Sequence, residues 1–63
     1  MANENPEVLG NYFIDNGSGV TLPIGLTTLK RALEEVKEKI KTNSAATLWE
    51  RTKDKGAQRV DLN

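Results

Sequence analysis

The sequence has 63 residues, with nine basic and nine acidic side chains and neither cysteine nor histidine. A chain of this size forms one small domain at most. The composition excludes disulfides, thiolate metal sites and catalysis by histidine, and the balanced charge gives no long-range attraction for nucleic acids or anionic membranes. We therefore expect a protein that is not an enzyme and has no cofactor, no membrane partner and no nucleic acid as its main partner.

The first residues of the chain are polar and are interrupted by Pro6 and Gly10. This pattern predicts a flexible N-terminal arm over residues 1–10, followed by a single domain over residues 11–63. The start of the sequence lacks the basic and apolar runs of a signal peptide, and no apolar stretch is long enough to span a membrane. A cytoplasmic location is the expectation that follows.

Two short apolar segments, residues 12–14 and 20–22, flank an Asn-Gly step and predict a β-hairpin. A loop of two or four residues would place Phe13 on the same face as the apolar residues of the second strand. A loop of three residues would place Tyr12 and Ile14 there instead, because a slip of one residue exchanges the two faces. The Asn-Gly step favours the first register and the amount of apolar surface favours the second, so the sequence leaves the register open.

An amphipathic helix follows the hairpin, after a strand that ends or becomes an edge at Pro23 and a brief turn. Five apolar residues recur at helical spacing and predict one buried stripe, namely Leu29, Ala32, Leu33, Val36 and Ile40. We expect Thr27 or Thr28 to cap the start of the helix, Leu33 to lie at the centre of the core, and Asn43 to end the helix in a left-handed conformation.

The last third of the chain is ambiguous. Residues 46–52 alternate as a strand does, with a turn at residues 53–56 and a possible return over residues 58–62. Ser44 could equally cap a second helix that stops at Gly56. The strand is favoured because a two-stranded hairpin is a poor cover for the apolar stripe of the helix. The predicted fold class is thus α+β, a small β-β-α-β(-β) domain with an antiparallel sheet and one helix packed on one of its faces.

Three residues of the predicted strand are candidates for binding a partner. If Leu48 faces the helix, then Thr47, Trp49 and Arg51 project together from the other side of the sheet. Tryptophan and arginine are the residue types most enriched at hot spots of protein interfaces. The alternative is that Trp49, the only tryptophan in the sequence, completes the core of the domain.

One segment resembles the strand-to-helix region of small phage-encoded inhibitors of bacterial RNA polymerase. The matching residues are Leu22-Pro23-Ile24, Thr28-Leu29 and Ala32-Leu33-Glu34. This resemblance implies a β-β-α-β domain that binds the polymerase jaw and blocks initiation of transcription, with basic residues on the last strand, where Arg51 lies here. The helix start Leu29-Lys30-Arg31 is also similar to that of small phage head–tail joining proteins, although those have a further helix before the hairpin.

The patterns predict a small binding module, and the resemblance implies a phage-type accessory protein that binds and inhibits or modulates a larger protein of the host cell, in the host cytoplasm. The first alternative is a structural component of a virion, associated with the capsid or the head–tail junction. The second is a small nucleic-acid-binding protein, which requires the fold to gather six basic residues on one face. These residues are Lys30, Arg31, Arg51, Lys53, Lys55 and Arg59.

Overall fold

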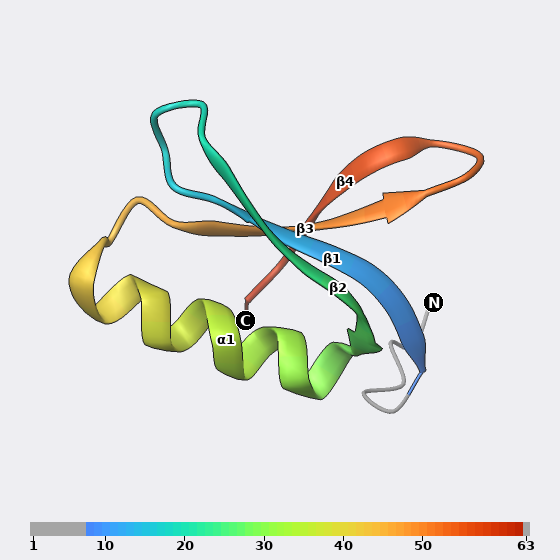
Figure 1. Cartoon of the computed structure of the whole chain (residues 1–63), viewed down its shortest axis with the longest axis horizontal. Helices are drawn as coiled ribbons and strands as arrows, with labels where there is room; N and C mark the ends of the chain where they lie inside the picture. Colours follow the sequence, from blue (N-terminus) through green and yellow to red (C-terminus); the bar gives the residue numbers. More distant parts are fainter. Residues whose placement is uncertain (1–7, 63) are drawn as a thin grey trace.

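The computed structural model describes residues 8–62 of the chain as four strands and one helix in the order β-β-α-β-β (Figure 1). The predicted α+β fold class is therefore confirmed. The elements are β1 (Leu9–Asp15), β2 (Thr21–Thr28), α1 (Leu29–Thr42), β3 (Thr47–Thr52) and β4 (Gly56–Val60).

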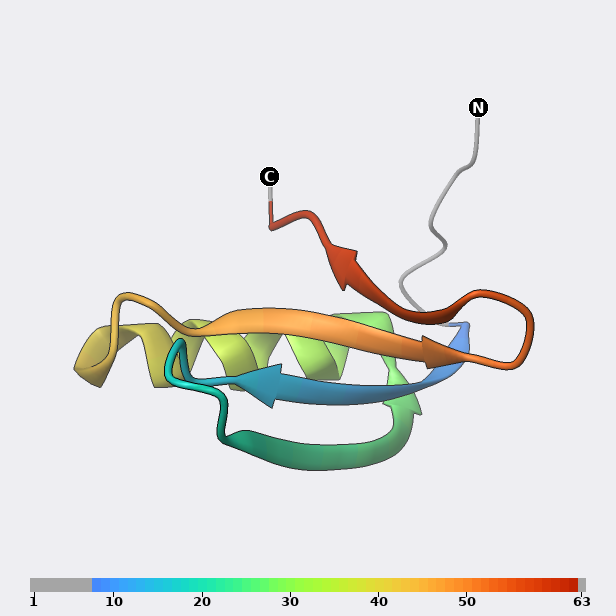
Figure 2. The same ribbon diagram turned by 90° about the horizontal axis from the view of Figure 1, so that it is seen from above.

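The strands form one antiparallel sheet in the order β2-β1-β3-β4, and Figure 2 shows them side by side in that order. Helix α1 packs on one face of this sheet, over β1, β2 and β3. Strand β1 begins at Leu9, so the last two residues of the arm predicted over 1–10 belong to the sheet. Residues 1–7 of that predicted arm lie outside the described residues.

The first hairpin adopts the register that buries two large side chains. Ile14 pairs with Leu22 and Asp15 with Thr21, which leaves a loop of residues 16–20. An odd number of loop residues places Tyr12 and Ile14 on the helix side, as the three-residue alternative required. A tight Asn-Gly turn needs a positive φ angle at both Asn16 and Gly17. In the described loop only Gly17 and Gly19 have positive φ, so this turn is not formed.

Strand β2 is an edge strand that continues past Pro23 to Thr28. The alternative in which Pro23 lies on an edge is therefore confirmed, whereas the strand does not end there and no turn precedes the helix. Proline is tolerated here because one side of an edge strand has no ladder to complete. The pairing between β1 and β2 shifts between Tyr12 and Phe13, where β2 contains one extra residue. Such a bulge bends the strand, and β2 then passes directly into α1.

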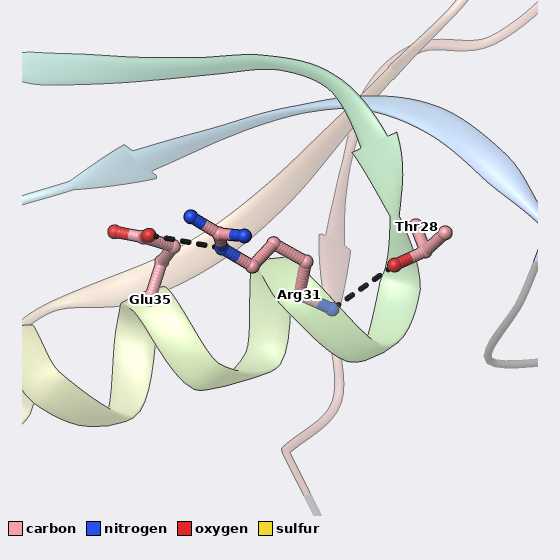
Figure 3. A network of polar contacts seen from close by, with 3 residues as sticks. All are labelled: Thr28, Arg31 and Glu35. Atoms are coloured by element: carbon pink, nitrogen blue, oxygen red, sulfur yellow. Dashed lines mark hydrogen bonds and ion pairs between the residues drawn. The ribbon is translucent and has the colours of Figure 1, made fainter.

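Helix α1 begins at a threonine cap. The Thr28 hydroxyl accepts a hydrogen bond from the backbone N–H of Arg31 at 3.2 Å, which satisfies one of the free amides of the first turn (Figure 3). The Arg31 side chain also forms an ion pair with Glu35, one turn further along. Of the two candidate caps, Thr27 and Thr28, the structure thus uses Thr28, and α1 begins at the next residue.

The helix ends at Asn43, as predicted, but not in the predicted conformation. Asn43 has φ −148° and ψ 95°, which is extended rather than left-handed. Its side chain explains the difference, because the amide nitrogen donates to the Asn16 carbonyl at 2.8 Å and the amide oxygen accepts from Ala45 N–H. Asn43 thus ties the end of α1 to the loop of the first hairpin.

The core lies between α1 and the helix-facing side of the sheet. Its buried apolar residues are Tyr12, Ile14, Leu29, Ala32, Val36, Ala46 and Leu48. The amphipathic stripe is confirmed, but Leu33 is only half-buried, so the prediction that it forms the centre of the core was wrong. The physical reason is that α1 does not extend over β4. Leu33 lies instead beside a groove between α1 and β4, which is also lined by Val60 and Leu62.

Residues 47–52 form a strand, not the alternative second helix. Leu48 pairs with Ile14 on β1 and is fully buried under α1. The return strand β4 also forms, over residues 56–60 rather than 58–62.

Candidate functional site

The candidate site is the sheet face that α1 does not cover, which we call the open face. Side chains alternate between the two faces of a strand, so burial of Tyr12 and Ile14 against α1 turns Phe13 to the open face. On β3 the buried Leu48 likewise turns its neighbours, including Trp49, to the same side. The two central strands of the sheet therefore each present an aromatic ring on the open face.

Phe13 and Trp49 are direct cross-strand partners. Their ring centroids lie 6.3 Å apart and their planes differ by 10°, which is a stacked arrangement. The Trp49 indole N–H donates to the Thr47 hydroxyl at 2.9 Å, so the ring is held along its own strand. Both aromatic residues remain half-buried, and the described residues place no helix over them.

Arg51 extends this pair into an aromatic and cationic surface. Its guanidinium carbon lies 5.0 Å from the centroid of the Phe13 ring, within the range of a cation–π contact. Arg51 forms no ion pair with another described residue, and the ion pairs Arg31–Glu35 and Glu38–Lys41 both lie on α1. The Arg51 charge is thus held over an aromatic ring and faces solvent.

The outer strands complete the open face. On β4, Arg59 pairs with Trp49 and Ala57 pairs with Arg51. On β2, Pro23 pairs with Phe13, and Leu26 pairs with Asn11. The Leu26 side chain is 72% exposed. The open face therefore combines two aromatic rings, two arginines and exposed aliphatic surface, which is the composition of a protein-binding surface.

The fold separates the basic residues predicted for nucleic-acid binding into two groups. Arg51 and Arg59 lie on the open face, and Lys53 and Lys55 lie in the turn between β3 and β4. The other two, Lys30 and Arg31, are on α1, on the opposite side of the sheet. The condition that all six gather on one face is therefore not met.

The structure brings together all three of the predicted site residues, Thr47, Trp49 and Arg51. The predicted partner-binding site omitted two further members of the surface. Phe13 could have been found only by fixing the register of the first hairpin, because its face depends on the length of the loop. Arg59 was named only as a candidate for nucleic-acid binding, and its place beside Trp49 depends on the pairing of β4 with β3.

Over residues 8–62, no group of three or more carboxylate, imidazole or thiol side chains is placed to hold a metal ion. The loop that follows Asp15 closes the hairpin with its own polar groups, since Asp15 Oδ1 accepts from Gly17 N–H and Asn16 Oδ1 accepts from Ser18 N–H. No helix in this part of the chain is long and apolar enough to cross a membrane.

No protein-family model, curated protein or solved structure matches this chain.

Proposed function

We propose that this protein is a non-enzymatic binding module that docks a larger protein on its open face and thereby inhibits or modulates it. The observation that carries the proposal is the stacked Phe13–Trp49 pair with the Arg51 guanidinium over the Phe13 ring, on the face without a helix. Such a surface is already ordered before a partner arrives, because each ring is fixed by a neighbour. A partner therefore meets rigid aromatic anchors and loses less side-chain entropy on binding.

A protein partner is favoured by the aliphatic part of the open face. Leu26 is 72% exposed and Leu9 is 61% exposed, and both belong to the β1–β2 side of the sheet. Aliphatic side chains have apolar surface to bury against a protein but stack poorly on nucleic-acid bases. The overall charge of zero adds no general attraction for phosphate.

The first partner to test is bacterial RNA polymerase. Its support is the residue resemblance to phage-encoded inhibitors in the β2–α1 segment, together with the place of Arg51 on β3, the strand that follows the helix as the last strand does in a β-β-α-β domain. A phage-type accessory protein in the cytoplasm of a bacterial host is the role that this partner implies.

The test is capture of proteins from a bacterial lysate on the immobilised chain, followed by binding and transcription-initiation assays with purified polymerase. Arg51→Glu reverses one charge on the open face, and Lys37→Glu makes the same change on the solvent side of α1. We expect Arg51→Glu and Trp49→Ala to lose the captured protein and Lys37→Glu to retain it. Equal capture by all three variants would place the binding surface elsewhere.

Single-stranded nucleic acid is a second candidate partner for the open face. It is favoured by the parallel rings on adjacent central strands, because bases stack on such platforms. Two phosphate contacts, from Arg51 and Arg59, would give a slope of about −1.4 in a plot of log affinity against log salt. Fluorescence anisotropy with labelled oligothymidine and oligouridine separates the two candidates, since the protein-binding proposal expects no saturable binding at physiological salt.

A further inference from the structure

The two edges of the sheet differ in their capacity to pair with another strand. The β2 edge contains Pro23, which has no backbone N–H, and a bulge that shifts its pairing with β1. Both features are known protections of an edge against strand addition. The β2 edge is therefore closed to a regular new ladder.

The edge formed by β4 carries neither protection. Its five residues contain no proline, and they pair with β3 in an unbroken register from Gly56 to Val60. Helix α1 packs on the other three strands and does not extend over β4. Four of the five residues are exposed, and Arg59 is the one charged side chain among them. An edge of this kind is a template for one more antiparallel strand.

We propose that β4 pairs with β4 of a second copy of this chain, antiparallel and about a two-fold axis at Gln58, to form a continuous eight-stranded sheet. In this register Gln58 lies opposite the second copy's Gln58, and Arg59 lies opposite the second copy's Ala57. Each cation therefore faces a small neutral residue rather than another cation.

The neighbouring registers with the same symmetry are less favourable. An axis at Arg59 places the two arginines directly opposite each other. An axis at Ala57 places Arg59 opposite the second copy's Lys55. Like charges in directly opposed positions destabilise a strand pair. Among these symmetric registers, the charge pattern of β4 and its turn thus favours the one centred at Gln58, in which a second copy of β4 pairs without opposing like charges.

The dimer would also organise the open face. A two-fold axis normal to the sheet keeps both α1 helices on one side and both open faces on the other. The two Trp49 residues would be three inter-strand spacings apart across the sheet and offset by two residues along the strands, about 16 Å in all. The dimer therefore goes beyond the function proposed above, because it would present two copies of the binding surface side by side to one partner.

The experiment measures self-association of the purified full chain by sedimentation equilibrium, so it does not require the partner of the open face. The variants are Gln58→Lys and Gln58→Glu, alone and mixed in equal amounts. Thr21→Lys serves as the control, since it adds a charge to the exposed β2 strand at the opposite edge. Far-UV circular dichroism confirms that each variant is folded.

We expect the wild type and Thr21→Lys to form dimers. Each Gln58 variant alone should raise the dimer dissociation constant about two- to fivefold, because like charges meet at the axis. The mixture should restore dimers that contain one chain of each variant, because lysine then faces glutamate.

Three results would overturn the proposal. The first is a wild type that stays monomeric up to about 1 mM. If Gln58→Lys then weakens the binding of another protein, the β4 edge receives that protein's strand rather than a second copy. The second is a dimer that is indifferent to charge at Gln58. The third is loss of the dimer in both variants without recovery on mixing, which would exclude the register.

Discussion

The rings of Phe13 and Trp49 lie almost parallel, 10° apart with their centroids 6.3 Å from each other, on the two central strands of the sheet. This pair exists because β1 and β3 both turn an aliphatic residue, Ile14 and Leu48 respectively, towards α1. The alternate positions must then face away from the core. A hydrophobic core on one face of the sheet thus creates an aromatic surface on the other.

The first prediction concerns Trp49. We expect Trp49→Ala to lower the free energy of unfolding by only about 1 kcal/mol, because the variant loses a cross-strand aromatic pair but leaves the core intact. The same change should cost about 2 kcal/mol or more in partner binding. Urea unfolding followed by circular dichroism measures the first quantity, and titration with the captured partner measures the second.

Fluorescence provides an independent check of this placement, because the chain has one tryptophan. The half-exposed indole should be accessible to acrylamide in the folded protein. Strongly blue-shifted emission protected from the quencher, together with destabilisation by several kcal/mol in Trp49→Ala, would contradict the placement of Trp49 on the open face.

The second prediction concerns the contact between Arg51 and Phe13. A double-mutant cycle with Arg51→Gln and Phe13→Leu should give a coupling free energy of about 0.5–1 kcal/mol, the range of an exposed cation–π pair. Urea unfolding of the wild type, the two single variants and the double variant supplies the four free energies required. Additive effects of the two substitutions would show that the guanidinium does not interact with the ring in solution.

The third prediction compares three leucines that differ in burial. Leu48 is fully buried, Leu33 is half-buried beside the groove, and Leu26 is 72% exposed on the open face. Leu48→Ala should cost about 2–5 kcal/mol, because it removes transfer free energy and leaves a cavity. Leu33→Ala should cost about 1–2 kcal/mol, and Leu26→Ala should change stability by less than about 0.5 kcal/mol.

Urea midpoints of these three variants and the wild type provide the measurement. The side-chain atoms removed are the same in each case, so the order of the midpoints reports mainly burial, with a smaller contribution from the helix or strand propensity of alanine. A larger effect of Leu33→Ala than of Leu48→Ala would return Leu33 to the centre of the core.

The fourth prediction concerns the loop of the first hairpin. Gly17 and Gly19 both have φ of +92°, where an L-residue is strained, but only Gly17 is crowded. A Cβ atom on Gly17 would lie 2.7 Å from the Cβ atom of Ala45, whereas one on Gly19 would meet open space. Each change to alanine should cost about 1–2 kcal/mol for the backbone conformation, and Gly17→Ala should cost at least about 1 kcal/mol more because of the overlap.

Thermal or urea unfolding of the two alanine variants measures the difference between them. The double variant Gly17→Ala with Ala45→Gly removes the opposing Cβ atom and should recover the additional loss. Equal stabilities of Gly17→Ala and Gly19→Ala would show that the loop does not approach Ala45 closely.

The sequence by itself determined the elements whose signals are local. The apolar residues from Leu29 to Ile40 define the buried side of α1, because a helix repeats its pattern over several turns. The restriction of the cap to Thr27 or Thr28 and the end of the helix at Asn43 are also local, since they depend on the backbone groups of one turn. For the same reason, the alternation over residues 46–52 could favour a strand before its neighbours in the sheet were known.

Only the tertiary structure decided which side chains of the strands are buried. The face occupied by Phe13 depends on whether the loop contains an odd or an even number of residues, and burial of both Tyr12 and Ile14 against α1 outweighed the local preference of Asn-Gly for a tight turn. The side chain of Asn43 was likewise taken up by the distant Asn16 carbonyl. The open face depends on such pairings between distant strands, and a strand pattern that repeats every two residues cannot by itself specify them.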